Sequence, residues 1–173
     1  MPDFRICILI LRMHTIVRVA DENDAAIVQQ LFKEYADELQ ENLCFQGFSE
    51  ELEHPFAKYK QPQGCILLAI HDHEPVGCVA IKPTTDGTCE MKRLYIKPAF
   101  RALGLGKVLV DEILKVAQEK GYDKMVLETL ERLQPAIQLY LSRGFVITDP
   151  YYANPLANVV YMQRELKTET QVP

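Results

Sequence analysis

A short segment between a predicted strand and a predicted helix constrains the fold of this chain most. It reads Arg101-Ala-Leu-Gly-Leu-Gly106, follows the strand predicted at residues 88–96 and opens the helix predicted at residues 104–120. Gly104 and Gly106 let the backbone approach a ligand closely and adopt conformations closed to other residues. The first N–H groups of a helix have no partner within it, and the helix dipole adds positive charge there. The segment therefore predicts a phosphate-binding loop.

The charges around this loop support the same interpretation. Residues 91–110 hold no acidic residue and five basic ones, which are Lys92, Arg93, Lys97, Arg101 and Lys107. Basic side chains beside exposed backbone N–H groups suit a pyrophosphate. Residues 21–53, in contrast, hold ten acidic residues against a single base, Lys33. This acidic block is interpreted either as the solvated surface of two helices or as a surface that attracts a cationic ligand.

The order of predicted elements places the loop in a mixed sheet. Strands are predicted at residues 15–20, 65–70, 76–82, 88–96, 125–130, 145–148 and 159–166, and helices at residues 22–40, 49–59, 104–120 and 135–143. Antiparallel strands followed by a strand–helix–strand unit imply a mixed sheet with helices on both faces. We therefore expect an α/β fold with an α+β type of mixed sheet, in which about seven strands are flanked by four helices. A dinucleotide-binding fold is disfavoured, because its third glycine is replaced by Leu109.

Length and composition bound the class of protein. The chain has 173 residues, of which 48% are hydrophobic and 25% are charged, and these values are typical of one globular domain. The net charge of −5 argues against a nucleic-acid-binding protein. The apolar run at residues 6–11 is too short to span a bilayer, so no membrane partner is expected. Five cysteines without a C-x-x-C pair favour a reducing compartment, and we expect a cytoplasmic protein.

Two further motifs accompany the loop. The strand before it reads Cys89-Glu-Met-Lys-Arg-Leu-Tyr-Ile96, and farther along stands Ala136-Ile-Gln-Leu-Tyr140, followed by Leu-Ser-Arg-Gly-Phe145. In this order the three motifs resemble those of the GNAT superfamily, the Gcn5-related N-acetyltransferases. The resemblance implies the GNAT acyltransferase fold and three parts of the chain: an N-terminal extension at residues 1–13, an N-acetyltransferase domain at residues 14–167 and a C-terminal tail at residues 168–173.

The resemblance also implies acetyl-CoA as the co-substrate and no metal. In the family, the loop wraps the pyrophosphate through backbone N–H groups, which maps onto Arg101, Ala102, Leu103, Gly104, Leu105, Gly106 and Lys107. The main chain of the preceding strand binds the pantetheine arm, which maps onto Leu94, Tyr95 and Ile96, and the sheet splays open beside it. Relatives often carry an asparagine that contacts the CoA arm where this chain has Leu133. Metal binding at His71 and His73 is disfavoured, because their predicted turn has no third group of ligands.

Two residues are candidates for the proton transfers of the reaction. A primary amine with a pKa near ~10 is protonated at pH 7, and a carboxylate can take its proton directly or through water. In some relatives a glutamate eleven residues before the loop does this, and the matching residue is Glu90. The alternative for Glu90 is an ordinary salt-bridged strand residue. Many relatives place a tyrosine where Tyr140 stands, to reprotonate the leaving thiolate, and the alternative for Tyr140 is plain helix packing.

These inferences lead to one expected function and one alternative. We expect an N-acetyltransferase that moves an acetyl group directly from acetyl-CoA to a primary amine of a small molecule or a protein. The alternative is a non-catalytic module with the GNAT fold that senses acyl-CoA by binding it. A cationic acceptor is expected if the acidic block borders the acceptor entrance, as this segment commonly does in the family. Tyr151 and Tyr152 are expected to shape the acceptor pocket, and a homodimer is left open.

Overall fold

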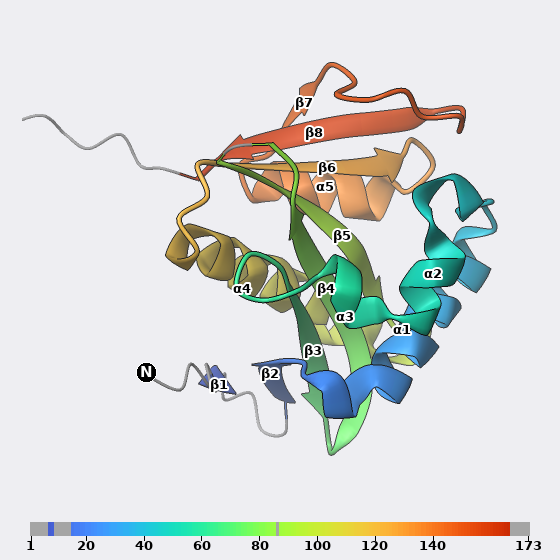
Figure 1. Ribbon diagram of the computed structural model, residues 1–173, viewed down its shortest axis with the longest axis vertical. Helices are drawn as coiled ribbons and strands as arrows, with labels where there is room; N and C mark the ends of the chain where they lie inside the picture. The colour runs from blue at the N-terminus through green and yellow to red at the C-terminus, as the bar shows by residue number, and fades with distance from the viewer. Residues whose placement is uncertain (1–6, 9–14, 86, 167–173) are drawn as a thin grey trace, which may run out of the picture.

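The sheet is mixed, and its order differs from the order of the strands in the chain. The computed structural model describes residues 7–8, 15–85 and 87–166. The strand order is β1-β2-β3-β4-β5-β6-β8-β7, with bounds β1 (Cys7–Ile8), β2 (Thr15–Val19), β3 (Cys65–His71), β4 (Glu74–Pro83), β5 (Thr88–Ile96), β6 (Lys124–Leu130), β7 (Val146–Thr148) and β8 (Val159–Glu165). Neighbouring strands are antiparallel except β5 and β6, which are parallel. The predicted mixed α/β sheet is confirmed (Figure 1).

Strand β1 is the strand that the sequence did not predict. Its two residues lie in the predicted N-terminal extension and pair with Arg18 and Val17 of β2. The predicted tail at residues 168–173 lies outside the described residues. Of the helices in the described ranges, none is both long and apolar enough to cross a membrane.

The helices cover both faces of the sheet. Their bounds are α1 (Ala25–Leu39), α2 (Phe48–Glu53), α3 (Pro55–Lys58), α4 (Leu105–Glu119) and α5 (Gln134–Ser142). The single helix predicted at residues 49–59 is wrong, because the structure divides it into α2 and α3 at His54. Pro55 explains the break, since a proline has no N–H to donate and disfavours the helical conformation of the residue before it.

Alternate residues of the central strands face opposite hydrophobic clusters. Leu67 and Val79 pack with Leu109 of α4 in one cluster, whereas Leu68 and Cys78 pack with α1 in the other. This alternation follows from the two-residue period of a strand. The predicted inner face of α4 is confirmed, since Leu105, Leu109, Ile113 and Val116 are all buried.

The sheet opens between β5 and β6. The parallel pairing of these two strands ends at Glu90 and Val126, although β5 continues to Ile96 and β6 to Leu130. Beyond this point β5 pairs only with β4, and β6 pairs only with β8, among the described strands. The two halves of the sheet therefore separate beyond Glu90, along the C-terminal part of β5.

An irregularity in β5 lies at the same place. The register between β4 and β5 shifts between Cys78 and Ala80, and Arg93 on the opposite strand has a φ of 59°. A bulge inserts an extra residue and bends the strand. Arginine rarely adopts this left-handed conformation, so neighbouring contacts must hold it there.

Candidate active site

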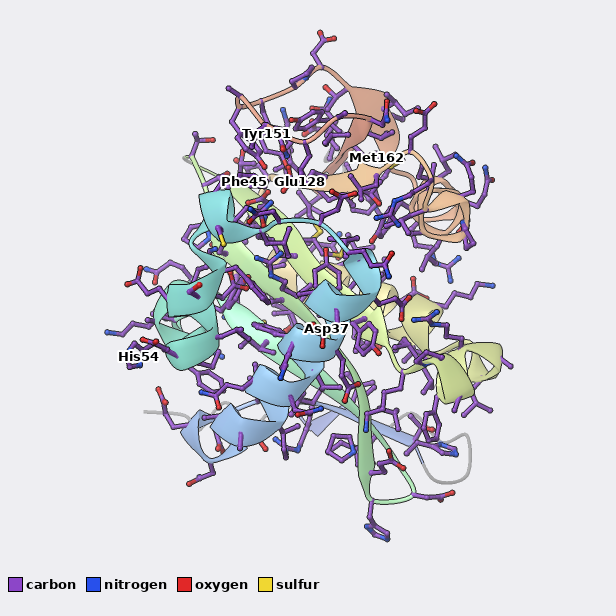
Figure 2. The ribbon with its side chains drawn as sticks, turned by 90° about the vertical axis from the view of Figure 1, so that its right-hand side faces the viewer. Asp37, Phe45, His54, Glu128, Tyr151 and Met162 are labelled. Atoms are coloured by element: carbon purple, nitrogen blue, oxygen red, sulfur yellow. The ribbon has the colours of Figure 1, made fainter. Side chains whose placement is uncertain are left out.

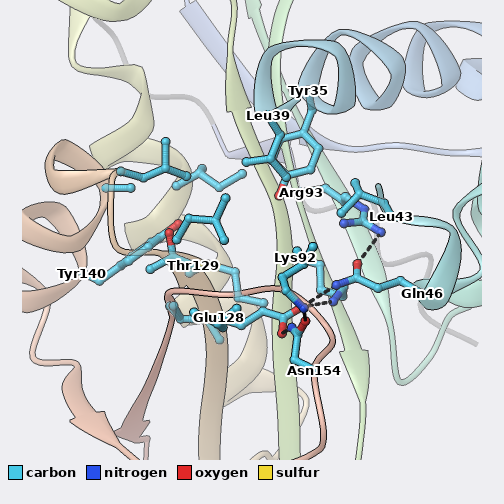
Figure 3. A pocket seen from close by; sticks show the side chains of 18 residues that line it. Tyr35, Leu39, Leu43, Gln46, Lys92, Arg93, Glu128, Thr129, Tyr140 and Asn154 are labelled. Carbon is cyan, nitrogen blue, oxygen red and sulfur yellow. Dashed lines mark hydrogen bonds and ion pairs between the residues drawn. The ribbon is translucent and has the colours of Figure 1, made fainter. Parts of the chain in front are cut away.

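A cavity of about 110 Å³ fills the opening between the two strands (Figure 3). The ends of β5 and β6 form two of its sides, and α1 with the turn after it, α5 and the β7–β8 loop form the others. It occupies the place where the family resemblance predicts that the sheet splays open. Of the predicted site residues, Leu94 and Tyr140 line this cavity.

Tyr140 is buried on α5 and points its hydroxyl toward the cavity (Figure 3). Its ring packs edge-on against Phe145, with 5.8 Å between the ring centroids. Burial raises the pKa of Tyr140 above its usual value. The hydroxyl is therefore protonated at neutral pH and can donate a proton to a developing anion.

Glu90 is buried beside the cavity but is not one of the residues that line it. Its carboxylate lies 3.1 Å from the ammonium group of Lys82 and 3.4 Å from that of Lys92. The hydroxyl of Tyr151 donates a hydrogen bond to it over 3.0 Å. Burial would raise the pKa of Glu90, but the two lysines outweigh that effect and hold the pKa below its ordinary value. The structure thus shows Glu90 as a salt-bridged carboxylate, one of the two interpretations that the sequence left open.

Glu128 is the carboxylate that lines the cavity, and it belongs to none of the motifs that predicted the site. Its Oε1 accepts hydrogen bonds from Gln46 Nε2 at 2.5 Å and from Lys92 Nζ at 3.3 Å. Its Oε2 accepts hydrogen bonds from Asn154 Nδ2 at 2.8 Å and from the Tyr152 hydroxyl. One signal was available, because Glu128 is the one charged residue inside a mostly apolar predicted strand.

The two carboxylates are joined by Lys92. Its ammonium group lies between Glu90 and Glu128 and is nearly inaccessible to solvent. Burial lowers the pKa of Lys92, and the two neighbouring carboxylates offset this only in part. The polar end of the cavity is therefore a compact network in which each ionised group has an oppositely charged neighbour.

The predicted phosphate loop is an exposed turn that opens α4. Gly104 has a φ of 72° and ends a short 3-10 helix at residues 98–103. A Cβ atom at Gly104 would meet nothing within 4 Å, and one at Gly106 would approach only the side chains of Leu139 and Ile96. The space in front of both glycines is thus open to a ligand. The first N–H groups of α4 point into it, as the helix geometry requires.

The charged side chains of this loop differ in their surroundings. Lys107 is exposed. Arg101 donates from Nε to the carbonyl oxygen of Ile96 at 3.0 Å, and its Nη2 binds both carboxylate oxygens of Glu38 on α1. The sequence predicted Arg101 as a positive charge for a pyrophosphate, whereas the structure shows it already paired with a carboxylate. Ala102 and Leu103 are exposed, and the side chain of Leu105 is buried in the core.

The side chains at the end of β5 also differ in their surroundings. Leu94 faces the cavity, while Tyr95 packs against α1 and donates a hydrogen bond to Glu34 over 3.4 Å. Ile96 is buried in the cluster beneath α4. The main chain of these residues borders the opening of the sheet, which is the arrangement expected for a strand that binds an extended ligand.

Arg93 holds the bulge of β5 against α2. Its Nε and Nη2 bind the two carboxylate oxygens of Glu51 at 2.7 and 2.9 Å, and both side chains are almost fully buried. Lys58 binds Glu51 as well, at 2.7 Å. Burial would raise the pKa of Glu51, but Arg93 and Lys58 hold it at about 2. This buried pair compensates the unfavourable backbone conformation of Arg93.

The β7–β8 loop closes the site from the other side. Figure 2 shows Tyr151 at the same end of the molecule as Glu128 and Phe45. Tyr151 and Tyr152 bind Glu90 and Glu128, and both rings pack against Tyr161. The two tyrosines therefore position the carboxylates, whereas Asn154 and Leu156 of the same loop line the cavity itself.

Within the described part of the chain, no group of three or more His, Cys, Asp or Glu residues could hold a metal ion. His71 makes a hydrogen bond with Thr15 across the sheet, over 2.7 Å. The acidic residues of the site are engaged by lysine, tyrosine and amide groups instead.

Comparisons with known proteins agree with this geometry. Residues 28–145 match the model of the acetyltransferase (GNAT) family. The chain is 47% identical over 140 residues to an uncharacterized N-acetyltransferase of Schizosaccharomyces pombe, covering 80% of this chain and 86% of the relative. A GNAT acetyltransferase structure from Staphylococcus aureus has a TM-score of 0.75 at 19% identity, covering 88% of this chain and 99% of that one. The structure of YncA from Salmonella typhimurium with its cofactor acetyl-CoA has a TM-score of 0.65 at 20% identity, covering 92% and 98%.

Proposed function

The chain belongs to the acetyltransferase (GNAT) family, and we propose that it transfers an acetyl group from acetyl-CoA directly to an amine. One observation carries the proposal. The open loop at Gly104 and the cavity with Tyr140 lie along the same strand end, so one extended ligand can reach both. CoA has this shape, with a pyrophosphate at one end and a thioester at the other. The YncA structure with acetyl-CoA shares the fold and supports the choice of co-substrate.

The proposed reaction joins the amine nitrogen to the carbonyl carbon of the thioester. The new C–N bond forms as the C–S bond breaks, and the leaving thiolate takes the proton of the Tyr140 hydroxyl. The hydroxyl carries its proton at neutral pH, although burial raises its pKa and makes it a weaker acid than an exposed tyrosine. A carboxylate can remove the proton of the attacking amine, directly or through water.

Two carboxylates are candidates for the base. Glu90 is the residue that the family resemblance implies, and it reaches the cavity only through its neighbours or water. Glu128 lines the cavity, and its position favours it as the group that contacts the acceptor nitrogen. We propose that Glu128 receives the acceptor ammonium, with Glu90 as the alternative base.

A binding assay and a turnover assay together test the proposed function. CoA should stabilise the fold by about 2.7 kcal/mol at a concentration 100-fold above its dissociation constant. Acetyl-CoA should then release free thiol when amines are added. Stabilisation without thiol release would favour the sensor module instead. If CoA does not stabilise the fold and no thiol is released, both functions are contradicted. The cytoplasmic location and the homodimer remain predictions from the sequence.

A further inference from the structure

One part of the cavity surface is apolar and comes from separate segments of the chain. We call it the leucine wall, and it consists of six aliphatic residues: Leu39, Leu43, Leu130, Leu133, Leu156 and Val159. Leu39 ends α1, Leu130 ends β6, and Leu156 lies in the β7–β8 loop. These residues form a hydrophobic cluster distinct from the two clusters that lie beneath α1 and α4. The leucine wall is therefore a built surface rather than a chance exposure.

Few charges reach the cavity. Among its described lining residues, those charged at neutral pH are Lys92, Arg93 and Glu128. Arg93 is neutralised by Glu51, and Lys92 lies between Glu90 and Glu128. In the part of the chain that the structure describes, the cavity thus offers one carboxylate and no second negative group for a dication.

The acidic block at residues 21–53 adds no charged side chain to the cavity lining. The residues of the block that line the cavity are all uncharged, namely Tyr35, Leu39, Leu43 and Gln46. Four of its acidic residues bind cations of this same chain, in the pairs Asp24–Arg18, Glu38–Arg101, Glu41–Arg132 and Glu51–Arg93. Asp37 is exposed on the outer surface of α1 (Figure 2). The cavity itself therefore gives no support to a polycationic acceptor.

We propose that the acceptor is a monoamine with an apolar body, an inference that rests on the function proposed above. Its nitrogen lies at Glu128, and its hydrocarbon body covers the leucine wall apart from Leu133, the position that the family resemblance gives to the CoA arm. Burial of apolar surface is favourable in proportion to its area, whereas burial of a charge without a partner is strongly unfavourable. An alkyl or arylalkyl monoamine satisfies both conditions, whereas a polyamine would bury a second charge without a partner.

A matched pair of amines tests the acceptor class. Hexylamine and 1,6-diaminohexane have the same chain length and differ by one terminal ammonium group. We expect kcat/KM for hexylamine to exceed that for the diamine by at least about tenfold, because the second charge would lie against the leucine wall. The preference should hold at about 0.1 and 1 M salt, since it comes from burial rather than from long-range attraction.

Variants of one wall residue show whether the wall holds the acceptor or the cofactor. Leu156 is only partly buried, so Leu156→Ala is tolerable for folding. It should raise KM for hexylamine several-fold and leave KM for acetyl-CoA unchanged. Leu156→Glu should narrow the preference for hexylamine over the diamine, because it adds a partner for the second ammonium group. Leu141→Ala is the control, since Leu141 is 40% exposed and lies outside the cavity lining.

The outcomes separate this inference from the proposed function. Faster acetylation of the diamine, or a rise of KM for acetyl-CoA in Leu156→Ala, overturns the apolar acceptor and leaves the transferase intact. If CoA stabilises the fold but neither amine releases thiol, the apolar acceptor is overturned and the transferase function then depends on other amines. Hexylamine preference together with the expected shift in Leu156→Ala supports the inference.

Discussion

The guanidinium group of Arg101 binds both carboxylate oxygens of Glu38, at 2.6 and 2.5 Å from its Nη2. This pair joins the phosphate loop to α1, two segments that lie far apart in the sequence. Nearly half of each side chain is exposed, so the pair contributes only about 0–1 kcal/mol to stability. A phosphate group bound in the loop would compete with Glu38 for the same guanidinium group.

Replacing Glu38 by glutamine should therefore strengthen CoA binding. Removal of a competitor worth up to about 1 kcal/mol corresponds to a gain of up to about fivefold in affinity. Calorimetric titration of CoA at about 0.1 M salt measures this change in affinity. Glu41→Gln is the matched control, because Glu41 pairs with Arg132 instead. Weaker CoA binding by Glu38→Gln would show that Glu38 orients Arg101 for the ligand.

Valine at Gly104 or Gly106 should remove most of the stabilisation by CoA. A Cβ at either position would project into the space proposed for the pyrophosphate, and Gly104 also has a left-handed φ. Gly121→Val is the control, since Gly121 has a φ of 84° with nothing near its Cβ, at the other end of α4. A thermal shift with CoA that stays at the wild-type value in both loop variants would contradict the phosphate-loop assignment.

Tyr140→Phe should lower kcat by about 10²- to 10⁴-fold, the usual range for general acid catalysis, while the affinity for acetyl-CoA changes little. The hydroxyl is needed only when the thiolate develops. Tyr122→Phe serves as the control, because Tyr122 donates to Gln63 on the surface and lies outside the cavity. An unchanged kcat, measured where chemistry limits the rate, would leave Tyr140 as a packing residue.

Glu128→Gln and Glu90→Gln distinguish the two candidate bases. If Glu128 receives the acceptor, its variant should lower kcat/KM for the amine more than Glu90→Gln does, and KM for acetyl-CoA should stay constant. The profile of kcat/KM against pH should lose its acidic limb in the variant of the base. A larger loss of kcat/KM in Glu90→Gln, together with loss of the acidic limb of its pH profile, would identify Glu90 as the base.

The buried pair between Arg93 and Glu51 predicts a pH-dependent stability. The pKa of Glu51 is lowered to about 2 in the folded chain, so its contribution is complete above the ordinary glutamate pKa and is lost as pH falls through about 2. Glu51→Gln should lower the free energy of unfolding at pH 7 by about 3 kcal/mol. Denaturant unfolding measured at decreasing pH should show the difference in free energy of unfolding between the unchanged chain and Glu51→Gln becoming smaller. A difference independent of pH would assign the effect to packing.

Local patterns in the sequence were enough to predict most of the strands and the loop at Gly104. Their signals lie within a few residues, such as the apolar stripe of α4 and the glycine pair at its start. The break at His54 was also readable, since Pro55 marks it. Most element ends differ from the predictions by at most two residues, as helix and strand ends commonly do, whereas α1 begins three residues later, after a 3-10 turn at residues 22–24.

The polar half of the site could not be predicted in the same way. Glu128 meets Gln46 and Asn154 only because β6 separates from β5 and the β7–β8 loop returns over the opening. The Arg101–Glu38 pair likewise depends on where α1 lies on the sheet. Such contacts join residues that are distant in the chain, and no local pattern encodes them.

The opening between β5 and β6 leaves the two halves of the sheet joined by a short seam. Only three residue pairs, from Thr88–Lys124 to Glu90–Val126, join the two halves by strand pairing. Each half keeps its own continuous ladder, through β4 on one side and β8 on the other. Amide exchange at this seam would therefore report how readily the two halves part.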